Sequence, residues 1–254
     1  IGDYRIEMSN LDIKIKKKTF LLNQQGKKKE NLIFKNLILS IKDGQFVSVF
    51  GPSGCGKSTL LNMISGLDKN YDGSVKIENN KKTSENNISY MFQTPRLFPW
   101  LTAIENVKFP IKDNKNSEKI AFDLIKKVGL EKYVNQYVNR LSGGMQRRVA
   151  MARAFAPNPK VLLLDEPFIS IDSKISESLR KLLIQLWKKN KPTIIFVTHD
   201  LDEAIELADR IFFLSNLPSR ILLDHDINLA RPRNKSNKKF ASLKRLLSSA
   251  TKSK

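Results

Sequence analysis

The chain has 254 residues, of which 41% are hydrophobic and 28% charged. That length allows one large domain with a buried core, and the composition argues against wholesale disorder. The longest apolar stretches, 161–164 and 194–197, are far shorter than the roughly 20 residues of a membrane-spanning helix. The N-terminal residues lack the pattern of a secretory signal, so we expect no export. A single cysteine, Cys55, excludes a disulfide framework and a multi-cysteine zinc cluster, and fits the cytosol.

Positive charge dominates the sequence, with 45 Lys and Arg against 25 Asp and Glu, a formal net charge of +20. Such an imbalance is compatible with nucleic acid, an anionic membrane surface or an anionic ligand as partner. The runs 14–18, 27–29 and 188–189 are mostly Lys without interleaved aromatic residues of the kind that stack on bases. We therefore interpret most of this charge as solvated surface, with a membrane surface ahead of nucleic acid as the alternative.

The first 64 residues predict strands followed by a loop and a helix. Apolar alternation at Leu11, Ile13 and Ile15 indicates a strand, the polar stretch 23–31 indicates a loop, and apolar patterning resumes through 34–41. Lys42, Asp43 and Gly44 favour a turn before the buried-type strand 46–50. A glycine-rich loop then leads into a helix over 57–64.

The middle of the chain, roughly 94–160, favours helices. Ser117 is expected to cap a helix with apolar residues at helical spacing, which Gly129 ends, and a second helix is expected from Gly143 or Gly144 to Phe155. Strands and helices alternate afterwards, at 161–165, 174–187, 194–198, 201–208 and 211–214. This alternation predicts an α/β domain with a mostly parallel sheet. The stretch 234–254, rich in Lys and Ser, is expected to be a mobile or loosely docked basic tail.

Residues 51–59 match the pattern of a phosphate-binding loop, G-x-x-x-x-G-K-[ST], between a buried strand and a helix. Backbone N–H groups of such a loop surround phosphates, and the helix directs its positive end toward them. Lys57 would neutralise the β and γ phosphates, and Ser58 would offer a hydroxyl to Mg²⁺. The predicted nucleotide-binding residues are Gly51, Pro52, Ser53, Gly54, Cys55, Gly56, Lys57, Ser58 and Thr59, with Cys55 as a small filling residue.

Two carboxylates, Asp165 and Glu166, follow the apolar strand 161–164. The carboxyl edge of an open α/β sheet is the usual ligand crevice. We predict that Asp165 holds the Mg²⁺ shell through water and that Glu166 acts as general base on the attacking water. An acidic pair in this place is otherwise often a turn or a helix cap, and the phosphate-binding loop makes the catalytic interpretation the stronger one.

A second glycine-rich helix start lies at Ser142, Gly143, Gly144 and Met145, 85 positions after Lys57. Ser142 is a typical N-cap residue, and the glycines expose N–H donors suited to an anion. One chain has no obvious use for two phosphate-binding helix starts. The sequence therefore suggests a composite site, in which one copy caps nucleotide that another copy holds.

With Leu141 included, this Leu-Ser-Gly-Gly segment and the phosphate-binding loop make the chain resemble the ATPase subunit of an ABC transporter, from about Leu11 to Arg233. The resemblance implies a P-loop (RecA-like) core over 1–92 and 161–233, an N-terminal antiparallel β subdomain and an inserted α-helical subdomain over 93–160. It further implies that Gln93 senses Mg²⁺ and the γ phosphate, that His199 contacts the γ phosphate and orients Glu166, and that Asp172 communicates across a dimer. Phe20 is the candidate for stacking on adenine, with Tyr4 as the rival.

Two positions depart from the family pattern. Met145 stands where glutamine is commoner, as in many importer subunits, and Ile171 stands where a smaller pair of residues is usual. Phe98 and Trp100 are either core residues or part of a surface groove that receives a short helix of a membrane partner.

The resemblance implies an importer ATPase that uses ATP and Mg²⁺ on the cytoplasmic face of the membrane. Its implied partners are a second copy or a paralogous ATPase subunit, multi-spanning permease subunits and, indirectly, a solute-binding protein. Pro99-Trp100 and Arg231-Pro232-Arg233 resemble the nitrate, sulfonate and taurine importer group, which also includes thiamine-precursor transporters. A nucleic-acid-associated ATPase of the same family is the alternative, although one cysteine and the short spacing between the motifs fit its known classes poorly.

Overall fold

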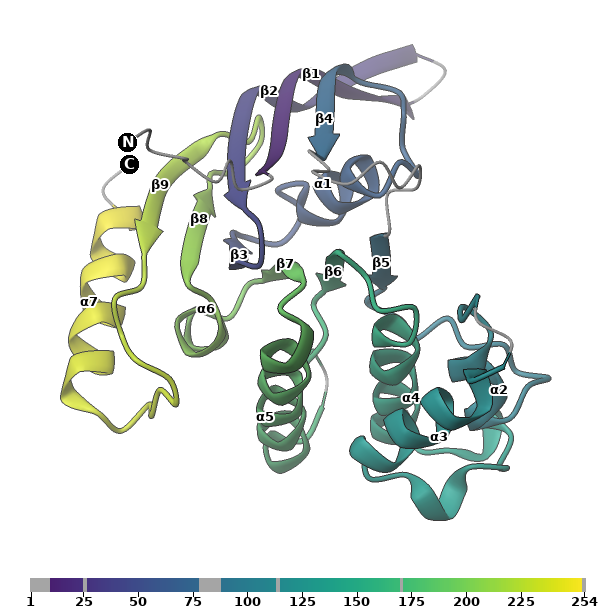
Figure 1. The fold of residues 1–254 in the computed structure, drawn as a ribbon. Helices are drawn as coiled ribbons and strands as arrows, with labels where there is room; N and C mark the ends of the chain where they lie inside the picture. The colour runs from purple at the N-terminus through teal and green to yellow at the C-terminus, as the bar shows by residue number, and fades with distance from the viewer. Residues whose placement is uncertain (1–9, 25–26, 78–87, 113–114, 170, 253–254) are drawn as a thin grey trace, which may run out of the picture. The chain divides into compact units, whose positions relative to one another are not determined.

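The computed structural model describes residues 10–24, 27–77, 88–112, 115–169 and 171–252 (Figure 1). Contacts divide the chain into two units, the first formed by 1–86 and 195–254 and the second by 87–194. Tyr4, the rival candidate for adenine stacking, lies outside the described residues. No helix among the described residues is long and apolar enough to cross a membrane.

The first unit contains an antiparallel sheet in the order β2-β1-β4, formed by β1 (Asn10–Gln24), β2 (Lys27–Lys42) and β4 (Asp72–Ile77). The predicted alternation is confirmed, since Ile13 pairs with Leu39 and both are buried. The loop expected at 23–31 is wrong, because β2 begins at Lys27 and Asn31 pairs with Phe20. Backbone ladder hydrogen bonds require no apolar side chains, so the pairing extends past the apolar part of both strands.

The first unit also contains β3 (Phe46–Phe50), which pairs in parallel with β8 (Arg210–Leu214), and β9 (Ile221–Asp226), which pairs antiparallel with β8. Helix α1 (Lys57–Ile64) follows β3, as predicted. Strand β7 (Thr193–Thr198) is buried throughout and crosses the boundary between the units, and α6 (Leu201–Leu207) follows it. A strand, a loop and a helix thus follow one another twice: β3 leads to α1, and β7 leads to α6.

The C-terminal segment is not the loose tail that the sequence suggested. It forms α7 (Lys238–Lys252), which lies beside α6 and β9 (Figure 1). Phe240 and Leu247 are 2% and 1% exposed and pack in one cluster with residues of α6 and β8. Lys244 forms an ion pair with Asp202 at 2.6 Å. Apolar residues three to four positions apart share one helix face, so a few of them dock a helix of otherwise polar composition.

In the second unit, β5 (Ile88–Met91) pairs in parallel with β6 (Val161–Asp165). The helices are α2 (Ala103–Lys108), α3 (Ser117–Lys127), η1 (Glu131–Tyr133), η2 (Val138–Arg140), α4 (Gly143–Phe155) and α5 (Ser173–Asn190). Helices α2, α3 and α4 pack together (Figure 1). The predicted helix 143–155 is confirmed.

The start of α3 differs from the prediction and its end agrees with it. Asn116 occupies the N-cap position without a side-chain cap, and Ser117 is the buried first residue of the helix. Gly129 has φ +72° and donates its N–H to the Lys126 carbonyl, as a helix-ending glycine does. Ser117 therefore lies inside α3 rather than at its N-cap position, and it is buried.

Candidate nucleotide-binding site

The lysine of the loop between β3 and α1 forms hydrogen bonds with backbone carbonyl groups of the same loop. Lys57 is 5% exposed, and its Nζ donates to the carbonyl oxygens of Gly51 and Pro52 at 2.9 Å each. Ser219 Oγ donates to the Cys55 carbonyl at 2.5 Å, and Cys55 is buried, as expected of a small filling residue. The loop that would surround phosphates therefore has a fixed shape set by contacts within its own unit.

Gly56 is required at the turn into α1 for two reasons. Its φ is +98°, and a Cβ there would lie 2.7 Å from Ile33 Cγ2 and 2.8 Å from Phe34 Cζ. Ile33 is the residue skipped in the pairing of β2 with β1, where Lys18 pairs with Phe34 and Thr19 with Leu32. This bulge lets two consecutive residues of β2 both be buried, beneath the loop. The antiparallel sheet thereby supports the turn that the loop needs.

His199 lies between a strand end and a well-capped helix. Thr198, the last residue of β7, donates its hydroxyl to Glu203 Oε2 at 2.9 Å and accepts the N–H of Asp200 at 3.0 Å. Asp200 caps α6 by accepting from the N–H groups of Asp202 and Glu203. His199 itself is exposed. The backbone of this exposed residue is therefore fixed on both sides by its neighbours.

The carboxylate of Asp165 has a partner that the sequence analysis missed. Tyr90, on the neighbouring strand β5, donates its hydroxyl to Asp165 Oδ2 at 3.4 Å. Burial first, and then the nearby carboxylate, raise the pKa of the Tyr90 phenol, so that it stays protonated and remains a donor. Parallel pairing of β5 and β6 brings these two residues together, and only the pairing could have identified Tyr90.

Glu166 adopts a backbone conformation that non-glycine residues rarely take, with φ +42°. Its carbonyl accepts the N–H of Ile169 at 3.2 Å, which closes a turn directly after β6. Such conformations cost of order 1–3 kcal/mol and cluster at functional sites. The strain at Glu166 is an independent observation in favour of a functional role for this carboxylate.

Gln93 is exposed and follows β5, at the start of a loop that side chains on both sides hold in place. The ring of Phe92 stacks on Tyr90 with centroids 4.0 Å apart, and the Arg96 guanidinium lies 3.9 Å from the Phe92 ring. Arg153 on α4 donates to the carbonyls of Pro95 and Arg96 at 2.8 and 2.9 Å. Gln93 is thus presented to solvent from a well-ordered loop.

The glycine-rich start of α4 is capped as predicted, since Ser142 Oγ accepts the N–H of Met145 at 3.3 Å. Gln146, which the sequence analysis passed over, donates to the carbonyls of Val138 and Leu141 at 3.0 and 3.2 Å. Arg147 donates to the Pro167 carbonyl at 3.4 Å. Among the described residues, a Cβ on Gly143 would meet no atom within 4 Å. These side chains therefore fix the segment, in which Ser142 and Gly143 are exposed, whereas a Cβ on Gly144 would touch Ile175 at 3.6 Å.

The remaining predicted residues have the following places. Asp172 is the N-cap of α5, with its side chain accepting the N–H of Lys174 at 2.9 Å. Phe20 is 41% exposed on β1. The first unit thus holds Phe20, the loop 51–59 and His199, and the second holds Gln93, the segment 142–145, Asp165, Glu166 and Asp172. The predicted site residues are therefore divided between the two units.

A Mg²⁺ ion fits the chemistry of two of these residues. Ser58 is an exposed hydroxyl on the first turn of α1, and Asp165 is a carboxylate at the end of β6. The described residues contain no group of three or more His, Cys, Asp or Glu side chains that could hold a metal by themselves. Both are oxygen donors of the kind that Mg²⁺ accepts, since proteins usually bind this ion through one or two carboxylates together with substrate phosphates and water.

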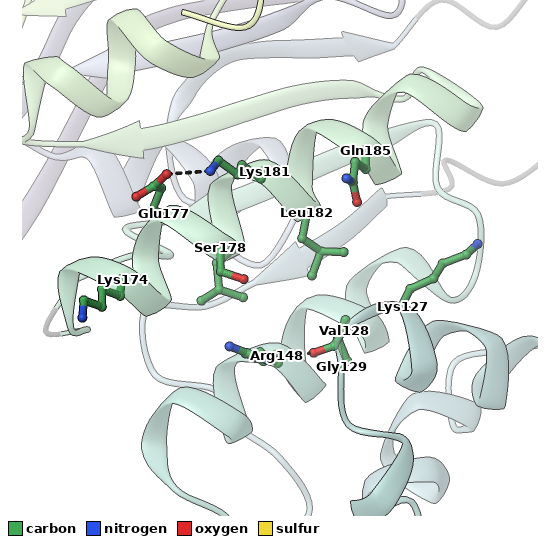
Figure 2. Close-up of a pocket in the computed structure, with 11 residues that line it drawn as sticks. Lys127, Val128, Gly129, Arg148, Lys174, Glu177, Ser178, Lys181, Leu182 and Gln185 are labelled. Atoms are coloured by element: carbon green, nitrogen blue, oxygen red, sulfur yellow. Dashed lines mark hydrogen bonds and ion pairs between the residues drawn. The ribbon is translucent and has the colours of Figure 1, made fainter. Parts of the chain in front are cut away.

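A pocket of about 490 Å³ opens in the second unit between α5 and helices α3 and α4 (Figure 2). Four cationic side chains and one carboxylate line it, and Lys181 and Glu177 pair at 2.6 Å. Arg148 donates to the Val128 carbonyl at the end of α3. None of the residues predicted to bind nucleotide lines this pocket, and so it is not part of the site that the motifs define.

Comparisons with known proteins agree with the motifs. A family model described as ABC transporter matches residues 34–169. The chain is 43% identical over 235 residues to the aliphatic sulfonates import ATP-binding protein SsuB of Bacillus subtilis (strain 168), covering 91% of this chain and 90% of that protein. It is 38% identical over 234 residues to SsuB 2 of Pseudomonas syringae pv. tomato, covering 92% and 94%.

Solved structures extend the likeness to the fold. The dimeric post-hydrolysis state of the ATP-binding cassette MJ0796 bound to ADP and Pi matches with a TM-score of 0.73 and 34% identity, over 87% of this chain and all of that one. A second dimeric structure of this bacterial ABC transporter cassette matches with a TM-score of 0.74. The P-loop α/β fold expected from the sequence is confirmed. Motifs, sequence likeness and fold agree that the chain belongs to the ABC transporter family, as one of its ATP-hydrolysing cassettes.

Proposed function

We propose that this chain is the ATP-binding subunit of an ABC importer and that its cargo is an aliphatic sulfonate or a related small anion. The observation that carries the proposal is the 43% identity to SsuB of Bacillus subtilis over nine-tenths of both chains. Nitrate, taurine and a thiamine precursor are the other cargoes of the importer group that the sequence resembles. The import relatives give no support to the alternative of a nucleic-acid-associated ATPase.

The residues of the two units divide the chemistry between them. Residues 51–59 bind the phosphates of ATP, with Lys57 as the cation, and Phe20 stacks on the adenine ring. Gln93 and His199 contact the γ phosphate, and Glu166 accepts a proton from the attacking water. Mg²⁺, held by Ser58 and Gln93 and, through water, by Asp165, neutralises charge that develops on the phosphates. Tyr90 keeps the Asp165 carboxylate oriented through its hydrogen bond.

We propose that two copies, or one copy and a paralogous subunit, clasp two ATP molecules. The open face of Ser142, Gly143, Gly144 and Met145 in one copy covers the nucleotide that the other copy's loop 51–59 holds. Asp172 communicates between the copies, from its fixed place at the start of α5. ATP stabilises the closed pair because it makes contacts there that the open state lacks, and hydrolysis reopens the pair.

Separate membrane subunits receive this motion on the cytoplasmic face of the membrane, and a solute-binding protein delivers the cargo to them. An aromatic surface formed by the loop after β5 and the end of α2 is the proposed contact. Trp100 and Phe109 are 68% and 67% exposed, and the half-buried Phe98 lies 5.6 Å from Trp100 and 4.7 Å from Phe109 between ring centroids. Large exposed aromatic groups of this kind mark interaction sites.

Replacement of the proposed base is the direct test. Glu166→Gln should leave ATP binding intact and lower steady-state ATP turnover by about 10²- to 10⁴-fold, the range for loss of a general base. The measurements are a binding titration with ATP and a phosphate-release assay at several protein concentrations. Turnover in the unchanged protein should rise steeply with concentration as copies pair. Lys57→Ala is the comparison variant and should weaken ATP binding itself.

An unchanged turnover in Glu166→Gln would remove this residue from its role, and normal ATP affinity in Lys57→Ala would count against the phosphate-binding loop. Full activity of a single isolated copy would contradict the paired site.

The membrane contact is tested separately. Replacing both Phe98 and Trp100 by Ser should release the chain from a permease with which the unchanged protein co-purifies in detergent, because the change removes the apolar contact area. ATP binding should remain, since neither residue contacts the loop 51–59 in the proposal. Retention of the permease by the double variant would place the contact elsewhere.

A further inference from the structure

Lys18 is a buried cation that the proposed function leaves unused. It is 2% exposed, and its Nζ lies 2.6 Å from Asp68 Oδ2. The same ammonium donates to the Asn70 carbonyl at 2.8 Å and lies 4.5 Å from the centroid of the Phe20 ring. An ammonium group has three N–H donors. A carboxylate, a carbonyl and an aromatic ring are thus the three neighbours that these donors address.

Lys18 and Phe20 share one face of β1, because residues two apart on a strand point to the same side. Lys18 is buried there, whereas Phe20 keeps 41% of its surface exposed. A cation within about 6 Å of a ring centroid interacts with the negative face of the ring, and more strongly when it is desolvated. The cation therefore draws electron density from the Phe20 ring, which favours stacking of an electron-rich purine on the exposed part.

Asp68 connects this cation to the phosphate-binding loop. Its N–H donates to the Asn62 carbonyl of α1 at 3.0 Å, and its Oδ1 accepts the N–H of Asn70 at 3.0 Å. Helix α1 begins at Lys57, directly after the loop 51–56. The pair of Lys18 and Asp68 thus links the strand that carries Phe20 to the helix that carries Lys57.

A stabilising role alone does not explain a buried ion pair in this place. Burying the Lys18 ammonium costs several kcal/mol, only part of which its pairing with the 19% exposed Asp68 side chain offsets, and an apolar residue of similar volume often stabilises a fold equally well. An apolar residue in place of the lysine would not put a charge against the Phe20 ring, as the ammonium group does.

We propose that Lys18 is a positioning residue for the adenine base. It holds and polarises the Phe20 ring and sets its spacing from the phosphate-binding loop. The inference rests on the proposed role of Phe20 in stacking on adenine. Its consequence is specific, because Lys18 contributes to recognition of the base and not of the phosphates.

The experiment compares ADP with inorganic pyrophosphate, which has the phosphates but no base and, like ADP, is not turned over. Lys18→Met keeps the length of the side chain without its charge, and Asp68→Asn in the same variant avoids an unpaired carboxylate. Calorimetric titration should show an affinity for ADP about threefold to tenfold lower than in the unchanged protein, as expected for the loss of a desolvated cation–π contact. The affinity for pyrophosphate should not change. An equal loss for both ligands, or unchanged affinity for ADP, overturns the inference.

Phe20→Leu separates this inference from the proposed function. It should lower the affinity for ADP and not for pyrophosphate, and in its background the Lys18→Met, Asp68→Asn change should have no further effect on ADP. If Phe20→Leu leaves ADP binding unchanged, the adenine assignment fails, and the inference fails with it. If Phe20→Leu weakens ADP binding and the Lys18 change does not, only the inference fails.

A milder variant covers the case in which the paired variant does not fold. Asp68→Asn alone keeps the lysine and weakens its anchor, so it should reduce the affinity for ADP by a smaller factor in the same direction. No effect on ADP, or an equal effect on pyrophosphate, overturns the inference here as well. Lys57→Ala should lose both ligands and confirms that pyrophosphate reports on the phosphate-binding loop.

Discussion

The two glycine-rich helix starts of this chain are built in opposite ways. At the start of α1, a Cβ on Gly56 would overlap Ile33 and Phe34, and Lys57 bonds to two carbonyls of the same loop. At the start of α4, a Cβ on Gly143 would meet nothing within 4 Å in the part of the chain that the structure describes, and Ser142 is exposed. Contacts within the chain therefore account for the first glycine and do not account for the second.

This difference indicates whether each helix start makes its contacts within the chain or with another molecule. Glycine in a helix is less favourable than alanine by roughly 0.5–1 kcal/mol, so a glycine without a packing reason costs stability. Gly143 also has no positive φ that would require it. Close approach of a molecule from outside would account for this glycine, as in the proposed closure of α4 over nucleotide held by a second copy.

The largest effect that tests this contrast is expected at Gly56. Gly56→Ala should lower the free energy of unfolding by about 2–4 kcal/mol, because left-handed backbone strain adds to overpacking against Ile33 and Phe34. Denaturation with urea, followed by far-UV circular dichroism, measures the loss. Nucleotide binding should fall as well, since the loop cannot keep its shape.

Gly54 provides the matched control for Gly56, because it lies in the same loop and has a similar φ of +79°. A Cβ on Gly54, however, would meet no atom of the described residues within 4 Å. Gly54→Ala should therefore cost only the backbone strain, roughly 1–2 kcal/mol. Equal losses in the two variants would show that crowding against β2 is not what requires a glycine at position 56.

The sequence was sufficient for the parts of the fold and site that depend on local chemistry. Residues 51–59 lie between β3 and α1 as the motif requires, and the helix from Gly143 to Phe155 has the predicted bounds. Ser142 caps that helix through the N–H of Met145. Each of these features involves residues within a few positions of one another, and so their spacing determines them.

Features that depend on pairing between distant segments were not predictable in this way. The partner of Asp165 is Tyr90, 75 positions away, and it is brought there by the parallel pairing of β5 with β6. The bulge at Ile33 arises from the register of two strands. Helix α7 docks through Phe240 and Leu247. The composition of this segment, which is rich in Lys and Ser, does not reveal that these two residues are buried. Sequence periodicity describes one segment at a time, whereas these contacts are properties of two.

The smallest change in the free energy of unfolding is expected at Gly143, where the predicted change is an increase rather than a decrease. Gly143→Ala should raise the free energy of unfolding by about 0.5 kcal/mol, because it adds a better helix former where no atom obstructs a Cβ. Turnover of ATP should nevertheless fall by about tenfold to a hundredfold, since a methyl group at the closing surface displaces the reacting groups. Lys238→Ala, at the start of α7, is the control and should change neither quantity appreciably.

A stability gain without loss of turnover would mean that nothing approaches Gly143 in the working protein. A loss of stability would mean that the second helix start is packed like the first, and the contrast between the two loops would disappear.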